Sequence, residues 1–267
     1  NDTIALYSTN GALLVDARPA HFEFVGTGLI TADMTLASGA LSGLTVTGVE
    51  LATSGAHSPI AGGRLSGLFA IRDEHAPALQ ADLDAMARDL VARFEDPSLD
   101  PTLSVGDAGL FTDNGFALDP GNIVGLSARL AVNDTVNPAE GGAVWRLRDG
   151  IGAAALGPVG EPALLDAMHQ RLNDRVAPTG GSLSAVGRTA SGFAADLLSS
   201  VGQSLELSNS RMAFRQAQHS GLDDAIKSQG VDTDQELQKL LLVEQIYAAN
   251  ARVIQTADEL IQLLIGL

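Results

Sequence analysis

The last stretch of the chain, residues 231–267, carries one helical period over its whole length. From Leu240 onward, apolar or small residues recur at alternating steps of three and four, which is the 3.5-residue spacing of a coiled-coil seam. Asn250 is the one polar member of this seam. The seam residues are Leu240, Val243, Tyr247, Asn250, Ile254, Ala257, Ile261 and Leu264.

A second apolar row runs beside this seam and makes the apolar face wider than one partner helix would cover. We therefore expect the helix to contact several neighbours. Thr233 and Glu236 have the spacing of a capping box and follow Gly230, so the helix is expected to begin near residue 233. The second row consists of Leu242, Ile246, Ala249, Val253, Leu260 and Leu267.

Charge and composition exclude several classes of function. The chain has 16 Lys and Arg residues against 32 Asp and Glu residues, a net charge of −16. This balance disfavours binding to nucleic acid or to an anionic membrane. Without cysteine, the chain has no disulfides and no thiolate chemistry. No apolar run reaches the length of about 18 residues that suggests a membrane-spanning helix.

The first 60 residues predict a small antiparallel β domain. Asn10-Gly11 lies between the apolar runs 4–7 and 12–15, which is a strong hairpin signal. The runs 21–25, 29–36 and 41–51 continue the strand pattern and are separated by glycines.

A long helix is predicted after the β domain, from about residue 65 to Phe94. Pro77 should kink this helix or delay its regular start, because proline removes one backbone hydrogen bond. Gln80, Asp84 and Asp89 are placed off the apolar stripe. The stripe consists of Ala76, Leu79, Leu83, Met86, Leu90 and Phe94.

Residues 61–230 as a whole are interpreted as a helical core with a loop-rich middle segment, 96–160. Within that segment, residues 123–132 fit either a short strand or a short helix. Leu164, Leu165, Met168 and Leu172 predict a short amphipathic helix begun by Pro162. A final long helix is expected from about Leu183 to Ser228. Its predicted seam is Val186, Phe193, Leu197, Val201, Leu205, Ser208, Met212 and Phe214 or Arg215.

Candidate catalytic and metal sites are weak throughout the chain. The histidines at positions 21, 57, 75, 169 and 219 lack metal-ligand spacing, so we expect them on the surface. The glycine clusters 26–28 and 62–67 lack the remaining residues of phosphate loops and are assigned to turns. Asp96, Asp100, Asp107 and Asp113 follow no calcium-binding spacing and are expected to form a solvated acidic loop. No cofactor, metal or enzymatic activity is predicted.

The C-terminal residues resemble a known family. Gln245, the run Tyr247-Ala248-Ala249-Asn250-Ala251, the run 256–260 and the final Leu-Leu pair are similar to the C-terminal segment of the bacterial flagellar axial proteins, which comprise the rod, hook and hook-associated families. The helix 63–94 and the segment 137–149 narrow this resemblance to the hook-associated protein 1 family, which joins hook to filament.

The resemblance implies a structural protein of mixed α and β class, with a long coiled-coil-like helical bundle and a small antiparallel β domain. It implies that residues 231–267 form an axial helix, for which the Leu240–Leu264 seam would be the assembly interface. Implied partners are copies of the chain, the hook protein, a neighbouring hook-associated protein and an export chaperone at the C-terminal helix. The implied location is the extracellular flagellum, reached by the flagellar type III pathway.

Two further expectations accompany this interpretation. The first residues, NDTIALYS, lack an initiator Met and a signal peptide, so we expect a fragment without the N-terminal helices of the family. An alternative function is a secreted adhesin or carbohydrate-binding module on a coiled-coil stalk. That alternative predicts a stable oligomer of the isolated chain, whereas the flagellar interpretation predicts a monomer.

Overall fold

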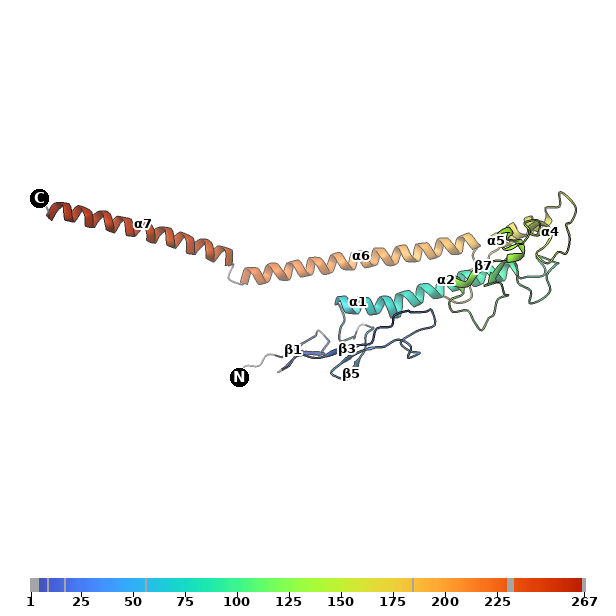
Figure 1. The fold of residues 1–267 in the computed structure, drawn as a ribbon, viewed down its shortest axis with the longest axis horizontal. Helices are drawn as coiled ribbons and strands as arrows, with labels where there is room; N and C mark the ends of the chain where they lie inside the picture. Colours follow the sequence, from blue (N-terminus) through green and yellow to red (C-terminus); the bar gives the residue numbers. More distant parts are fainter. Residues whose placement is uncertain are drawn as a thin grey trace. The chain divides into compact units, whose positions relative to one another are not determined.

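A computed structural model describes residues 5–8, 10–16, 18–55, 57–183, 185–229 and 233–265. The chain divides into two compact units, Asn1–Ser200 and Val201–Leu267. The predicted mixed α and β class is confirmed: short antiparallel sheets accompany long helices (Figure 1). The long coiled-coil-like bundle remains a prediction.

The N-terminal strands form two small antiparallel sheets. β1 (Leu6–Tyr7) pairs with β2 (Leu13–Val15), and Gly11 has a φ of +88°, so the hairpin predicted at Asn10-Gly11 is confirmed. A second sheet has the order β3 (Phe22–Phe24), β4 (Leu44–Val46), β5 (Val49–Leu51).

One strand prediction in this region is wrong. Residues 29–36 form turns, because the backbone N–H of Met34 donates to the carbonyl of Thr31 and the Thr31 hydroxyl donates to Asp33. The strand pattern of residues 41–51 forms two strands, with Gly48 in the turn between them. Thr47 and Gly48, with φ values of 49° and 79°, form the two-residue turn between β4 and β5, as in a type I′ hairpin.

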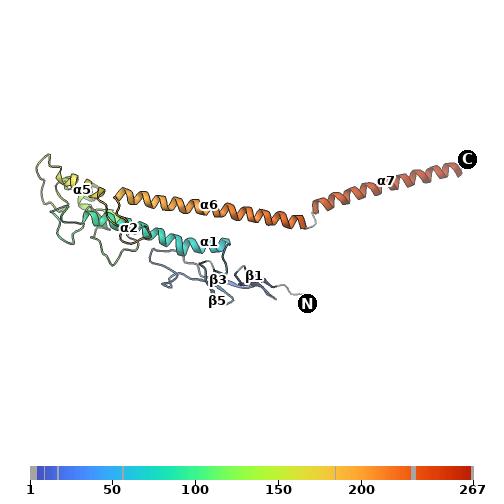
Figure 2. The same cartoon turned by 180° about the vertical axis from the view of Figure 1, so that it is seen from behind.

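Arg72 fastens the three-stranded sheet to the first helix. Its guanidinium lies 4.8 Å from the ring centroid of Phe69 and donates a 3.0 Å hydrogen bond to the carbonyl of Ser42, while pairing with Asp73. Phe24 meets Phe69 edge to face, with the ring centroids 5.7 Å apart. Figures 1 and 2 both show the β region lying alongside α1 (Arg64–Ala70).

The structure confirms that the regular α-helix is interrupted just before Pro77. α1 (Arg64–Ala70) passes into a π-helical turn, η1 (Ile71–His75), before α2 (Ala76–Phe94) begins with Pro77 in its first turn. The backbone N–H of Ala76 bonds the carbonyl of Ile71, five residues back. Since Pro77 has no N–H to continue an α-helical register, the wider turn places the proline at a helix start, where it is tolerated.

The predicted apolar stripe of α2 is largely wrong. Leu79 and Leu83 are exposed, whereas Asp82, Asp84 and Asp89 are buried. Asp82 and Asp84 face inward and accept hydrogen bonds from backbone N–H groups of loops, whereas Asp89 accepts from the Arg93 guanidinium. Phe94 alone of the predicted stripe is fully buried, and Met86 and Leu90 are half-buried.

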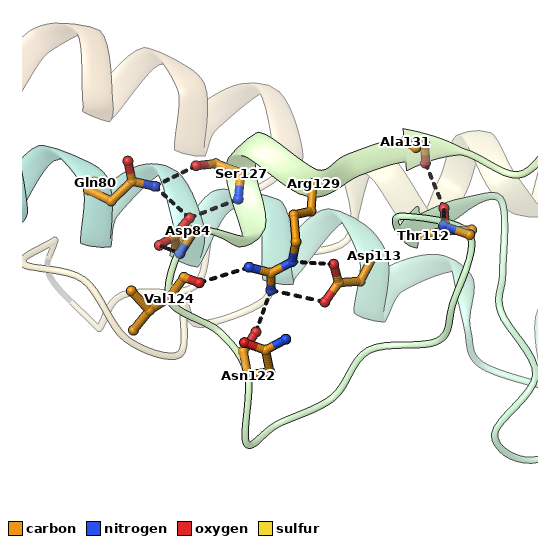
Figure 3. A network of polar contacts seen from close by, with 11 residues as sticks. Gln80, Asp84, Thr112, Asp113, Asn122, Val124, Ser127, Arg129 and Ala131 are labelled. Carbon is orange, nitrogen blue, oxygen red and sulfur yellow. Dashed lines mark hydrogen bonds and ion pairs between the residues drawn. The ribbon is translucent and has the colours of Figure 1, made fainter. Parts of the chain in front are cut away.

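Asp84 organises residues 123–132, which lie within the loop-rich segment. Its carboxylate accepts hydrogen bonds from the backbone N–H of Gly125 at 2.7 Å and of Ser127 at 2.8 Å, and from the Gln80 amide at 2.9 Å (Figure 3). These bonds hold α3 (Leu126–Arg129), which leads directly into β7 (Leu130–Val132). The segment 123–132 is therefore both helix and strand.

β7 pairs with β6 (Phe111–Asp113) and places Arg129 against Asp113. The Arg129 guanidinium donates to both Asp113 oxygens, at 2.6 and 3.0 Å, and to the carbonyls of Asn122 and Val124 (Figure 3). Arg129 thus connects Asp113, where the loop 113–129 begins, with the backbone of Asn122 and Val124 further along the loop.

Two small apolar clusters complete the core. Phe94, Leu99 and Met168 form one cluster, in which Phe94 meets Phe111 edge to face at 5.2 Å; Leu103, Val136 and Ile151 form the other. The remaining elements are η2 (Asp134–Val136), η3 (Pro138–Glu140), α4 (Arg146–Asp149) and α5 (Ala163–Asn173). The amphipathic helix predicted after Pro162 is thereby confirmed, with Met168 buried and Leu165 exposed.

The last two helices are α6 (Ala190–Gln229) and α7 (Thr233–Ile265). α6 begins seven residues later than the predicted Leu183, because Val176 and Arg188 pair as an isolated β-bridge and Thr189 caps the helix. The predicted start of α7 near residue 233 is confirmed. None of the helices in the described part of the chain is long and apolar enough to span a membrane.

Replacing Asp84 with alanine should lower the free energy of unfolding of the Asn1–Ser200 unit by about 2–4 kcal/mol, because two backbone N–H groups lose a buried charged acceptor. Urea denaturation followed by circular dichroism measures the loss. Glu74→Ala, at an exposed position about three helical turns earlier, is the control. A loss no larger than that of the control would contradict this role.

Glu95, at the end of α2, provides a pH-dependent test. Burial raises the pKa of its carboxyl above the ordinary value, although the backbone N–H of Leu118 donates to it. The folded state therefore holds this proton more tightly than the unfolded state, and the associated stability is present below pH 4.5 and lost as the pH rises through the folded pKa.

Glu95→Gln keeps an acceptor for Leu118 and removes the buried charge. The variant should unfold at a higher temperature than the parent chain near neutral pH, and the difference should vanish well below pH 4.5. Thermal melts at the two pH values check this. A destabilised variant at neutral pH would show that the charge is favourable there.

Candidate assembly surface

The predicted seam lies on α7, a helix of 33 residues. Within it, the side chains of residues 237–256 and of Glu259 are described. Leu240, Tyr247 and Ile254 are 68%, 77% and 69% exposed, and Val243 and Asn250 are also exposed. The side chains of Ala257, Ile261 and Leu264 lie outside the described residues, so the interface role of the whole seam remains a prediction.

The second apolar row widens the exposed face. With the seam at heptad positions a and d, this row falls at position g, which adjoins d on a helical wheel, and at position c, which adjoins g. Leu242, Ile246, Ala249 and Val253 are exposed, and Leu260 and Leu267 have no described side chains. The opposite arc carries polar residues such as Glu244, Gln245 and Arg252.

This face has the composition of a buried interface. An isolated helix in water gains little from apolar side chains that stay wet, whereas burying a Leu, Ile or Val side chain gains about 1.5–3 kcal/mol. Several adjacent exposed apolar residues on one helix therefore favour association with other helices. A polar residue such as Asn250 inside such a seam favours one register over others.

α6 carries an exposed apolar stripe in the same heptad phase. Leu205, Met212 and Ile226 precede Leu240 by whole multiples of seven residues, and all are exposed. Of the seam predicted for this helix, Phe193 and Leu197 are buried in the first unit, whereas Val186, Val201, Leu205, Ser208, Met212, Phe214 and Arg215 are exposed. Of the seam residues that lie within α6, the first two are thus buried and the others are exposed.

The other candidate sites behave differently from one another. The five histidines are exposed, as predicted. The prediction of a solvated acidic loop is wrong for two of its four members: Asp100 is 1% exposed and accepts from the backbone N–H groups of Thr102 and Ile151, and Asp113 pairs with Arg129. Asp96 accepts from the backbone N–H of Ser98, and Asp107 accepts from that of Ser104.

No cluster of three or more His, Asp or Glu residues that could hold a metal ion occurs among the described residues. The inward carboxylates instead accept hydrogen bonds from the chain itself. The sequence signal that identifies Asp82, Asp84 and Asp100 is weak, because each accepts from a backbone N–H group far away in the chain.

Comparison with known proteins bears on the same C-terminal segment. Residues 223–267 match the family model described as "Flagellar basal body rod FlgEFG protein C-terminal". Neither the curated proteins nor the solved structures include a match to this chain. The segment is thus similar to the C-terminal domain of the flagellar rod and hook family, and this similarity supports a structural component of the flagellum that assembles with other axial proteins.

The matched residues include all of α7 and therefore the whole predicted seam. The match also begins before α7, within the last turns of α6. The exposed apolar face and the segment of flagellar type are consequently the same part of the chain.

Asn250 provides a test of the seam. Asn250→Leu completes the apolar row and should increase self-association of the purified chain, because the polar residue that limits pairing is removed. Gln245→Leu, which adds the same side chain to the polar arc, is the matched control. Sedimentation velocity measures both, and equal association of the two variants would contradict a seam centred on residue 250.

Proposed function

We propose that this chain is a non-enzymatic structural subunit of the bacterial flagellum that joins the hook to the filament. The observation that carries the proposal is the wide exposed apolar face of α7, located within the segment of flagellar rod and hook type. The residues expected to make the axial contacts are Leu240, Val243, Tyr247, Asn250, Ile254, Ala257, Ile261 and Leu264.

Assembly follows from the energetics of this face. Each apolar side chain that a neighbouring subunit covers gains about 1.5–3 kcal/mol, which offsets the entropy lost when α7 is fixed in place. Because the face spans positions a, c, d and g, one neighbour leaves part of it exposed and several neighbours cover it. Copies of the chain, the hook protein and a neighbouring hook-associated protein are the proposed partners.

Before assembly, the same face needs protection. A cytoplasmic export chaperone that covers α7 would prevent premature association, and export in an unfolded state through the flagellar type III pathway would deliver the chain outside the cell. The absence of cysteine from the sequence is compatible with such a route, because no disulfide can form during transit. The proposed location is therefore the extracellular flagellum.

The Asn1–Ser200 unit would serve as the rigid part of the junction. Its buried ionic hydrogen bonds and apolar clusters provide a folded body that is independent of the α7 face. An adhesin or carbohydrate-binding module on a coiled-coil stalk remains the alternative. It predicts a stable oligomer and glycan binding by the purified chain, whereas the junction role predicts a monomer in static light scattering.

The double substitution Tyr247→Asp and Ile254→Asp tests the proposal. Both side chains are exposed, so the free energy of unfolding of the purified chain should stay within about 0.5 kcal/mol of the parent value and its circular dichroism should be unchanged. Filament attachment should nevertheless be lost. Gln245→Asp with Gln255→Asp places two carboxylates on the polar arc and should leave attachment intact. Normal motility of cells carrying the Tyr247/Ile254 variant would overturn the assembly role.

A further inference from the structure

The segment that joins α5 to α6, residues 174–189, is held against α2 by polar contacts. We refer to this segment as the strap; Ser184 within it is not described. The backbones of Val176 and Arg188 bond to each other at 3.0 and 2.9 Å, which closes the base of the strap. The two ends of the strap therefore lie next to each other.

Arg93 of α2 contacts both ends of the strap. It is 4% exposed, and its Nε donates to Asp89 at 2.7 Å. Its Nη1 donates to the carbonyls of Arg171 and Asp174, at 2.7 and 2.9 Å, and its Nη2 donates to the carbonyl of Arg188 at 3.0 Å. One guanidinium thus joins the end of α5, the first residue of the strap and its penultimate residue.

α6 begins directly after the strap, at Ala190. The Thr189 hydroxyl accepts from the backbone N–H of Gly192 at 3.0 Å and caps the helix, and Arg188 pairs with Asp196. Phe193 is 1% exposed. Arg188 therefore links Arg93 to the first turns of α6: its carbonyl accepts from Arg93, and its guanidinium pairs with Asp196.

The tip of the strap is attached separately. Asp82 of α2 accepts from both the hydroxyl and the backbone N–H of Ser182. Gly181, with a φ of +74°, lies so close that an added Cβ would approach Asp82 Oδ1 to 2.7 Å. The strap is thus attached to α2 at two points, at the tip by Asp82 and at the base by Arg93.

We propose that Arg93 is a positioning residue for assembly: it holds the first turns of α6 in place within the Asn1–Ser200 unit, and this inference rests on the proposed junction function. Apart from Asp89, it contacts the carbonyl groups of the last turn of α5 and of the two ends of the strap, and so it holds the backbone that leads into α6. A lysine cannot replace it, because an ammonium lacks the planar fork that reaches several acceptors at fixed angles.

Spin labels can measure the placement of these first turns, since the chain has no native cysteine. Ala81→Cys on α2 and Ala195→Cys on α6 are both exposed and belong to the first unit. The parent chain should give one narrow distance distribution, and Arg93→Met should broaden it about twofold or more because the strap base opens. Arg175→Met, at an exposed arginine of the strap, is the matched control and should leave it narrow.

Arg93→Lys keeps the charge that balances Asp89 and serves where the methionine variant does not fold. It should broaden the distribution to an intermediate width and speed hydrogen exchange of the Val176 and Arg188 amides about tenfold. Narrow distributions in every folded variant would overturn the positioning role and leave the junction function standing.

The cellular readout separates the two proposals. Cells that carry Arg93→Lys should assemble fewer attached filaments than cells that carry Arg175→Met. Normal attachment despite a broadened distribution would overturn the positioning role. Normal attachment with the Tyr247/Ile254 variant would overturn the junction function, and the distance measurement on the purified chain would still decide the role of Arg93.

Discussion

Buried ionic hydrogen bonds from α2 are the interaction on which the Asn1–Ser200 unit depends. Residues 95–189 form mostly short elements and loops, whose backbone N–H and carbonyl groups need partners when they are covered. Asp84 supplies acceptors, Arg93 supplies donors, and both are at most 4% exposed. A buried charge without partners would cost several kcal/mol, so the helix and the loops stabilise each other.

The two units distribute polar and apolar groups in opposite ways. α2 turns Asp82, Asp84 and Asp89 inward and leaves Leu79 and Leu83 exposed, whereas α7 exposes a broad apolar face along its described side chains. The first arrangement satisfies charges within one chain. The second leaves apolar surface for other molecules to cover, as expected of a helix that completes its packing only in an assembly.

Local signals in the sequence predicted three local features. Asn10-Gly11 marked a hairpin, Pro77 marked an interrupted helix, and the period of residues 240–264 marked the helix α7. In each case the cause lies within a few residues of the effect: a permitted φ, a missing N–H or a helical repeat.

Long-range polar contacts could not be predicted in this way. Asp84 bonds residues 41 and 43 positions away, and Arg93 reaches Arg188, 95 positions away. Periodicity places charged side chains in solvent unless a distant partner is known, and so it assigned the wrong face of α2 to the core. The start of α6 was misplaced for the same reason, because the Val176–Arg188 bridge is invisible locally.

The central claim is that neighbouring subunits bury the apolar face of α7 in the flagellum. Ile254→Cys and Gln245→Cys introduce single thiols on the two sides of this helix in a chain without cysteine. In the purified chain both should react readily with a maleimide. In isolated flagella the account predicts strong protection of residue 254 compared with residue 245, and equal reactivity at both positions would contradict it.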